Sequence, residues 1–241
     1  MSVVLHKYGA DLGLPDISPF CIKLETYLRM AEIPFTTKPG DPFREAPKGK
    51  LPYIKHDGEV LADSSFIIRH LKSAFGDVLD EGMTSEEKAT TRAFQSMIEE
   101  HLYFILLYYR WQDPAGWRDY KPVVGSIMAK GGVPAFMRPI ALYFARKGVI
   151  KSLHGQGTGR HSLDELLSMG MELLDALSDF LGEKTYLFGD APRTLDAILF
   201  AFVGAMVIPE LDSPLKTYAL TKQNLVDYCH RIKERYYADL G

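Results

Sequence analysis

The chain has 241 residues, of which 46% are hydrophobic and 24% are charged, and its formal net charge at pH 7 is −3. This is the composition of a globular protein long enough for one or two domains with substantial cores. The slight net acidity argues against nucleic-acid binding as the main function. The two cysteines, Cys21 and Cys229, are too few for a disulfide framework or a zinc cluster, so we expect a reducing, cytoplasmic setting.

The most apolar stretches, 98–111 and 195–209, are too short to cross a bilayer. A membrane-spanning helix needs roughly 20 apolar residues. The first residues, MSVVLHKYG, lack the charged n-region and the long apolar core of a signal peptide. We therefore expect a soluble protein.

The N-terminal third of the chain alternates between strand and helix signals. Strands or helices are expected over 2–8, 18–32, 34–37, 52–56, 59–62 and 66–75. Ser18 offers a hydroxyl at a helix N-cap, and Pro19 occupies the first helical position, where no N–H is missed. Asp57-Gly58 is typical of a tight hairpin turn. This order of elements predicts a small thioredoxin-like domain.

From residue 84 on, the sequence predicts only helices. Thr84 and Glu87 have the spacing of a capping box, and the apolar residues that follow recur every three or four positions up to Tyr109. Further helices are expected over 121–130, 134–152, 162–181, 195–208 and 222–237. The predicted fold class is an α/β thioredoxin-like N-terminal domain (1–76) joined to an all-α C-terminal domain (84–241).

Leu51 and Pro52 directly precede a predicted strand. A cis bond between them would turn the backbone N–H and C=O of Leu51 outward, where a peptide-like ligand can pair with them. An ordinary trans proline at the start of a strand is the alternative.

Asp63 and Ser64 stand at the start of the predicted helix 66–75. The free N–H groups and the dipole of a helix N-terminus favour a carboxylate, and the Asp63 carboxylate can accept hydrogen bonds from an ammonium group. Together the two residues suit the α-amino acid end of a γ-glutamyl group. Plain N-capping is the alternative.

Ser18 lies at the first turn of the helix that follows the first strand. A hydroxyl in that position can lower the pKa of a thiol by donating a hydrogen bond to the thiolate. Cys21, one turn along, is either partly reactive or buried as a small apolar residue.

Taken in order, these motifs resemble the glutathione transferase family. The similar runs are SPFCIKLETYLRMAEIPF from Ser18, APKGKLPYI from Ala46 and DGEVLADSSFIIRHL from Asp57. The segment 189–202, GDAPRTLDAILFAF, is similar to the capping segment of that fold's central C-terminal helix. The segment 157–166 and the extended loop before Ser18 resemble the metaxin-like branch, which includes failed axon connections proteins.

The resemblance implies a glutathione site on the N-terminal domain, with glutathione as co-substrate and no metal. Leu51, ahead of a cis Pro52, would pair with the cysteinyl part of glutathione. Asp63 and Ser64 would bind the γ-glutamyl end, and Lys50 would pair with the glycyl carboxylate.

Two hydroxyl groups compete for the sulfur of glutathione. The resemblance puts Ser18 at the position that faces the sulfur in serine-type transferases, and Tyr8 at the position of the phenol in tyrosine-type ones. The loop between them leaves open which one reaches the sulfur, and we favour Ser18. In the second domain, Arg193 stands where the family has Ser or Thr three residues before Asp196, so the helix cap there must be rearranged or weaker.

Aromatic residues gather over 103–120. The resemblance implies that these helices wall the site of the second substrate, so Tyr108 and Trp111 are predicted to contact a flat, apolar electrophile. Packing in the core is the alternative for each of them.

The segment 121–163 contains no acidic residue, and its basic residues interleave with apolar ones at helical spacing. A basic amphipathic helix can lie on an anionic membrane surface or on an acidic partner. The alternative is a helix packed on its own protein, with solvated charges.

Two functions follow from these observations. The first is an enzyme that holds glutathione as a thiolate and adds it to a small electrophile, or uses it to reduce a peroxide. By resemblance it would be a homodimer. The second is a non-catalytic module that uses the same fold for protein or membrane-surface interaction. The complete set of glutathione-binding residues favours the transferase.

Overall fold

The N-terminal part of the computed structural model, which describes residues 3–42 and 44–240, is a four-stranded sheet with two helices. The strands β1 (Val3–Lys7), β2 (Phe35–Pro39), β3 (Tyr53–His56) and β4 (Glu59–Ala62) lie in the order β2-β1-β3-β4. The β1–β2 pair is parallel, and the β1–β3 and β3–β4 pairs are antiparallel. The helices are α1 (Pro19–Met30) and α2 (Ser64–Phe75). Ser2, predicted to belong to the first strand, lies outside the described residues.

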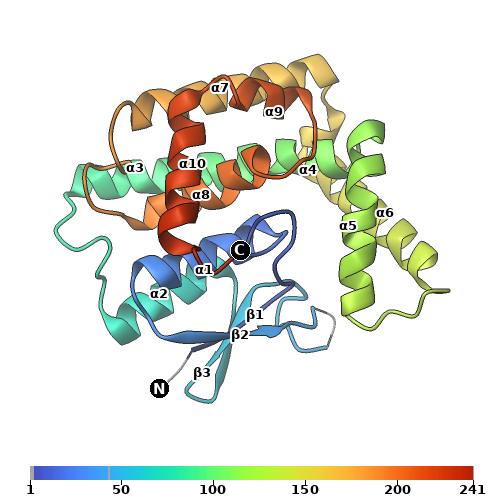
Figure 1. The fold of residues 1–241 in the computed structure, drawn as a ribbon, viewed down its shortest axis with the longest axis horizontal. Coiled ribbons are helices and arrows are strands. Elements are labelled where there is room, and N and C mark those ends of the chain that lie inside the picture. Colours follow the sequence, from blue (N-terminus) through green and yellow to red (C-terminus); the bar gives the residue numbers. More distant parts are fainter. Residues whose placement is uncertain (1–2, 43, 241) are drawn as a thin grey trace.

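The rest of the described chain is built from helices, which confirms the predicted fold class. They are α3 (Ser85–Ser96), the π-helical η1 (Met97–Leu102), α4 (Tyr103–Trp111), α5 (Pro114–Lys130), α6 (Arg138–Gln156), the short 3-10 turn η2 (Thr158–Arg160), α7 (Leu163–Leu181), α8 (Thr194–Val207), α9 (Pro214–Ala219) and α10 (Gln223–Tyr236). Every residue of α8 is buried, and Figure 1 shows α1 between this helical part and the sheet. None of the described helices has both the length and the apolar character that crossing a membrane requires.

The start of α8 shows how the chain caps a helix whose N-cap residue is an arginine. The Asp196 carboxylate accepts hydrogen bonds from the backbone N–H groups of Arg193 (2.8 Å) and Leu187 (2.9 Å). The N–H of Thr194 donates to Asp80 at 2.9 Å. Because Asp80 belongs to the connection between α2 and α3, the rearranged cap also joins the two halves of the molecule.

The helix predicted over 121–130 is wrong at its start, because α5 begins at Pro114. The Asp113 side chain accepts from the N–H of Gly116 at 2.8 Å, and Pro114 takes the first helical position. Pro122 therefore lies inside the helix, whereas a helix that began at residue 121 would have it in the first turn, the usual position of proline. The short helix α9 has a similar Ser-Pro start and was not predicted.

Candidate functional site

The loop 9–17 is held closed by one buried carboxylate. Asp16 accepts hydrogen bonds from the N–H of Gly9 at 2.8 Å and from the N–H of Ser18 at 2.8 Å. Burial raises the pKa of Asp16 to about 6, although both hydrogen bonds act in the opposite direction. The carboxylate therefore ties the end of β1, where Tyr8 lies, to the start of α1, where Ser18 lies.

The Tyr8 side chain lies where the two halves of the molecule meet. Burial raises the pKa of its phenol, and Cys21, Asp16, Tyr120 and Tyr103 add to this effect in that order. Tyr103 and Tyr120 come from α4 and α5, so the helical part supplies the opposite wall. At neutral pH the Tyr8 phenol keeps its proton and can act as a hydrogen-bond donor.

Ser18 and Cys21 are neighbours at the first turn of α1. Ser18 is the N-cap residue by position, but its hydroxyl makes no capping hydrogen bond, which corrects the capping role predicted for it. Burial raises the pKa of the Cys21 thiol well above its ordinary value, while hydrogen bonds from the Ser18 side chain and the Tyr8 backbone lower it. Cys21 is thus a buried, protonated thiol. Because the thiol keeps its own proton, the Ser18 proton is available to another acceptor.

A small apolar cluster joins the segments that the sequence predicts to bind glutathione. Cys21, Leu51 and Tyr53 form its core, and Tyr8 and Ala62 pack against it. These residues come from the ends of β1 and β4, the start of α1 and the approach to β3. The chain therefore brings the predicted binding segments to one end of the sheet.

The Leu51–Pro52 peptide bond is cis, the geometry that the family resemblance implies. Leu51 and Pro52 are buried, whereas Lys50, just before them, is exposed. The roles of these three residues toward glutathione stay predictions.

Asp63 caps α2 with its own side chain. One carboxylate oxygen accepts from the N–H groups of Ser65 (3.0 Å) and Phe66 (3.4 Å), and the other lies 3.7 Å from the Lys48 ammonium. The φ of Asp63 is +80°, a region that non-glycine residues rarely adopt. Ser64, the first residue of the helix, is buried. Asp63 thus uses one oxygen for the cap and the second for its ion pair with Lys48.

Ser65, to which the sequence assigned no role of its own, is the centre of a polar network between the two domains. Its hydroxyl oxygen accepts from Lys23 Nζ at 2.7 Å and from Gln95 Nε2 at 2.9 Å. The fully buried Lys23 also pairs with Glu99 at 2.6 Å. Because two donors occupy the oxygen, the Ser65 proton points elsewhere and can serve a carboxylate at the helix N-terminus. The feature of the sequence that could have indicated this network is Lys23, a lysine inside the apolar helix α1.

The two aromatic residues predicted to contact an electrophile have different surroundings on α4. The Trp111 ring meets Tyr120 edge to face at 5.6 Å, so it belongs to the aromatic group that reaches Tyr8. Tyr108 packs against the main hydrophobic core. The helical-domain phenols that raise the pKa of Tyr8 are those of Tyr103 and Tyr120. The place of Tyr108 and Trp111 in a substrate site stays a prediction.

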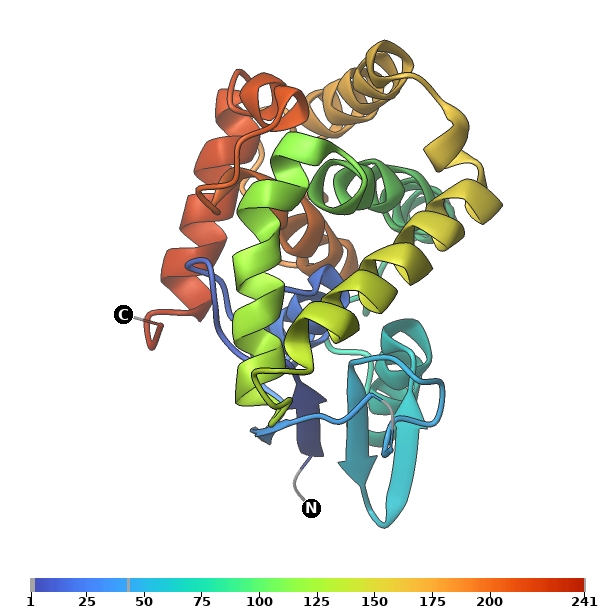
Figure 2. The same cartoon turned by 90° about the vertical axis from the view of Figure 1, so that its right-hand side faces the viewer.

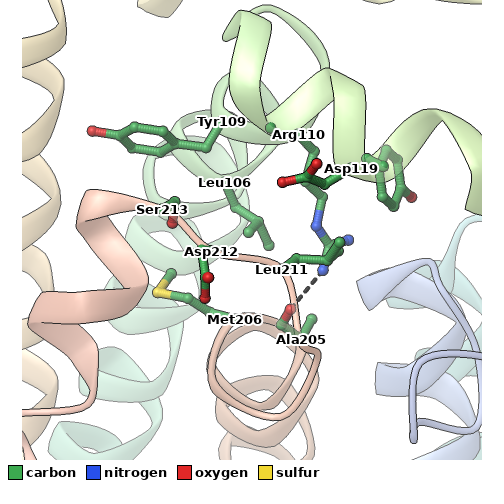
Figure 3. A pocket seen from close by; sticks show the side chains of 11 residues that line it. Leu106, Tyr109, Arg110, Asp119, Ala205, Met206, Leu211, Asp212 and Ser213 are labelled. Carbon is green, nitrogen blue, oxygen red and sulfur yellow. Dashed lines mark hydrogen bonds between the residues drawn. The ribbon is translucent and has the colours of Figure 1, made fainter.

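Arg110, on α4, connects the helical wall of the site to the loop 9–17 and to α8. Its guanidinium donates to the backbone oxygens of Ile17 at 3.2 Å and Ala205 at 2.5 Å, and it lies 5.2 Å from the centre of the Tyr120 ring. Arg110, Leu106 and Met206 line a cavity of about 20 Å³. Figure 3 shows how these side chains lie around it. Since this volume holds about one water molecule, the cavity is too small for an organic substrate.

Two family models match the chain. The glutathione S-transferase N-terminal domain matches residues 19–116, and the glutathione S-transferase C-terminal domain matches residues 170–232. Over 239 residues the chain is 37% identical to the isoprene-epoxide–glutathione S-transferase of a Rhodococcus strain, covering 97% of this chain and 99% of that protein. The chain belongs to the glutathione S-transferase family.

Other relatives confirm the branch of the glutathione S-transferase superfamily that the sequence predicts. Failed axon connections of Drosophila melanogaster is 31% identical over 247 residues, which cover 98% of this chain and 58% of that protein. Mouse metaxin-2 is 29% identical over 200 residues, which cover 81% of this chain and 73% of that protein.

Solved glutathione S-transferases share the fold. Glutathione transferase F7 of Populus trichocarpa matches with a TM-score of 0.60 and 14% identity, covering 99% of this chain and 97% of that one. A glutathione S-transferase of Methylobacterium radiotolerans, in complex with glutathione sulfonate, matches with a TM-score of 0.58 and 17% identity, covering 99% and 94%. At these identities the likeness shows the fold alone.

Proposed function

We propose that this protein binds glutathione and transfers it to a small, apolar electrophile, with epoxides as the substrate class. The apolar cluster around Cys21 carries the proposal, because it packs Tyr8, Leu51 and Ala62 together. These residues belong to the segments that the family resemblance assigns to the sulfur, the cysteinyl backbone and the γ-glutamyl group. The substrate class rests on the 37% identical relative named for isoprene epoxide.

In this proposal the γ-glutamyl carboxylate binds at the N-terminus of α2. Ser64 and Ser65 supply the donors there, and the Lys23 ammonium behind Ser65 adds positive charge. The second oxygen of Asp63 accepts from the α-ammonium group, and Lys50 pairs with the glycyl carboxylate. Each contact brings a charged group of glutathione to a group of opposite charge or to a donor.

The sulfur of glutathione is activated by the Ser18 hydroxyl. The Ser18 proton donates to the sulfur and favours the thiolate, and the neighbouring Cys21 thiol, which burial keeps protonated, does not need that proton. Tyr8 is the second candidate donor, since burial keeps its phenol protonated.

The thiolate attacks a carbon of the epoxide ring. The carbon–sulfur bond forms as the ring carbon–oxygen bond breaks, and the released oxygen takes up the proton that the thiol lost. Burial raises the pKa of Tyr103 to about 12 and also raises the pKa of Tyr120. Both phenols therefore stay protonated and can stabilise the developing negative charge on the ring oxygen.

Calorimetric titration with glutathione tests the binding site. Ser65→Ala removes a hydroxyl at the ligand end of α2, and Ser73→Ala, on an exposed residue of the same helix, is the matched control. We expect the first change to weaken binding about 10- to 100-fold, the effect of losing a hydrogen bond to a charged group. Ser73→Ala should bind like the unchanged protein. Absence of binding at millimolar glutathione would refute the proposal.

Conjugation assays with isoprene monoepoxide and styrene oxide test the chemistry and the sulfur ligand. We expect Ser18→Ala to lower kcat/KM about 100-fold and to move the rise of rate with pH to higher pH, because the thiolate loses its donor. A larger loss in Tyr8→Phe would assign that role to Tyr8. Glutathione binding without conjugation of any electrophile would favour the non-catalytic module.

The homodimer and the cytoplasmic setting stay predictions that belong with this function. Cys21 and Cys229 are both free and buried, a state that a reducing compartment preserves. Analytical ultracentrifugation of the purified protein tests the homodimer.

A further inference from the structure

The outward side of α6 carries large apolar side chains that are exposed to solvent. Phe136, just before the helix, is 80% exposed, Ile140 and Tyr143 are each 61% exposed, and Phe144 is 63% exposed. Figure 1 shows α5 and α6 at the outer edge of the molecule, and Figure 2 shows α6, in yellow-green, crossing the side turned to the viewer. No other described element covers this side of the helix in that view.

Helical spacing places basic residues on the same side as these apolar ones. Leu142 and Leu153 are buried and mark the inward side of α6. Ile140, Phe144 and Lys151 follow at intervals of four and seven residues, so they share the opposite side. The residues Phe136, Ile140, Tyr143, Phe144, Lys147 and Lys151 are called the α6 face below.

The α6 face is positively charged and has no acidic neighbour in sequence. Lys147 and Lys151 are exposed, and the segment 121–163 contains no aspartate or glutamate. The apolar residues occupy the first two turns of α6 and the lysines the next two. An exposed side with apolar groups next to cations can contact an anionic membrane surface, with the apolar groups at the edge of the lipid tails and the cations at the phosphates.

We propose that the α6 face docks on an anionic lipid bilayer surface. Phe136, Ile140 and Phe144 enter the boundary between headgroups and acyl chains, and Lys147 and Lys151 lie against lipid phosphates. Figure 2 shows α6 on the outer side of the molecule, where its exposed face is accessible to a membrane. The docking does not depend on glutathione transfer.

The charge of the face favours lipid over a second copy of the chain. In a two-fold symmetric dimer the same patch meets itself, so Lys147 and Lys151 of both copies would lie within one interface. Like charges brought together in this way repel, and the segment 121–163 offers no carboxylate to neutralise them. An anionic bilayer supplies the opposite charge.

Vesicle sedimentation with the full chain tests the proposal. The vesicles contain phosphatidylcholine alone or phosphatidylcholine with 30% phosphatidylserine. One variant combines Phe136→Ser, Ile140→Ser and Phe144→Ser, and a second combines Lys147→Gln and Lys151→Gln. The matched controls are Leu220→Ser, which alters an exposed apolar residue elsewhere, and Lys38→Gln with Lys88→Gln, which removes two exposed charges elsewhere.

The unchanged protein should bind the anionic vesicles and not the neutral ones, and added salt should release it. The lysine variant should bind about 25-fold more weakly, or about fivefold for each charge, and the apolar variant about tenfold or more. The controls should bind like the unchanged protein. Equal binding by all variants, or no binding by the unchanged protein, overturns the proposal. So does a dimer that the apolar variant dissociates, because the face would then join two copies.

Discussion

Replacing Asp16 with asparagine separates the charge of this buried carboxylate from its shape. Asp16 is fully buried, and burial raises its pKa from the ordinary 3.8 to about 6. The folded state therefore binds the proton more tightly than the unfolded state does. The stability that this group contributes is complete below pH 4 and is lost as the pH rises through 6. The difference between the two pKa values corresponds to about 3 kcal/mol at neutral pH.

Asparagine carries no charge, so Asp16→Asn escapes this loss. Compared with the variant, the unchanged protein should lose about 2 to 3 kcal/mol of unfolding free energy between pH 4 and pH 7. At every pH the variant turns an amide N–H₂ toward one of the two backbone N–H groups that Asp16 now holds, on Gly9 and Ser18. We expect it to bind glutathione more weakly, since the loop then holds Tyr8 and Ser18 less firmly.

Urea unfolding, followed by tryptophan fluorescence at a series of pH values, measures this difference directly. Asp196, whose pKa burial also raises to about 6, contributes equally to both proteins and cancels. Asp190→Asn, at an exposed carboxylate, is the control for loss of a surface charge. Parallel stability curves for the unchanged protein and Asp16→Asn would show that the two hydrogen bonds offset burial, and the reasoning would fail.

Two further substitutions test contacts that position the site. Gly116→Ala should destabilise the protein by about 3 kcal/mol or more in urea unfolding, because the new Cβ would lie 1.7 Å from the Tyr109 carbonyl oxygen. Gly125→Ala, on the same helix, is the control. Its Cβ meets nothing within 4 Å, so the change should cost little stability. Lys23→Met should cost about 3 to 5 kcal/mol and weaken glutathione binding, since it leaves the Glu99 carboxylate without its cation. Full stability in Lys23→Met would contradict the role given to this ion pair.

Local signals were sufficient to predict most elements of the fold. The Asp57-Gly58 turn and the capping box at Thr84 each act within a few residues, and both structures form. The family resemblance added the cis bond before Pro52. The failures were local as well: the helix start was predicted at residue 121, because the Asp113-Pro114 start of α5 was not recognised.

The fold class, the branch of the glutathione S-transferase family and the segments that carry the candidate site could all be predicted from the sequence. Which side chains meet at that site follows from the packing of the elements and could not be predicted. Lys23 contacts Ser65 and Glu99, and Tyr120 contributes to the raised pKa of Tyr8. The residues of each pair lie far apart in the sequence, and helical or strand spacing does not relate them. The physical reason is that capping and helix periodicity depend on neighbours in the chain. The partners of a buried charge or phenol instead depend on how separate elements pack.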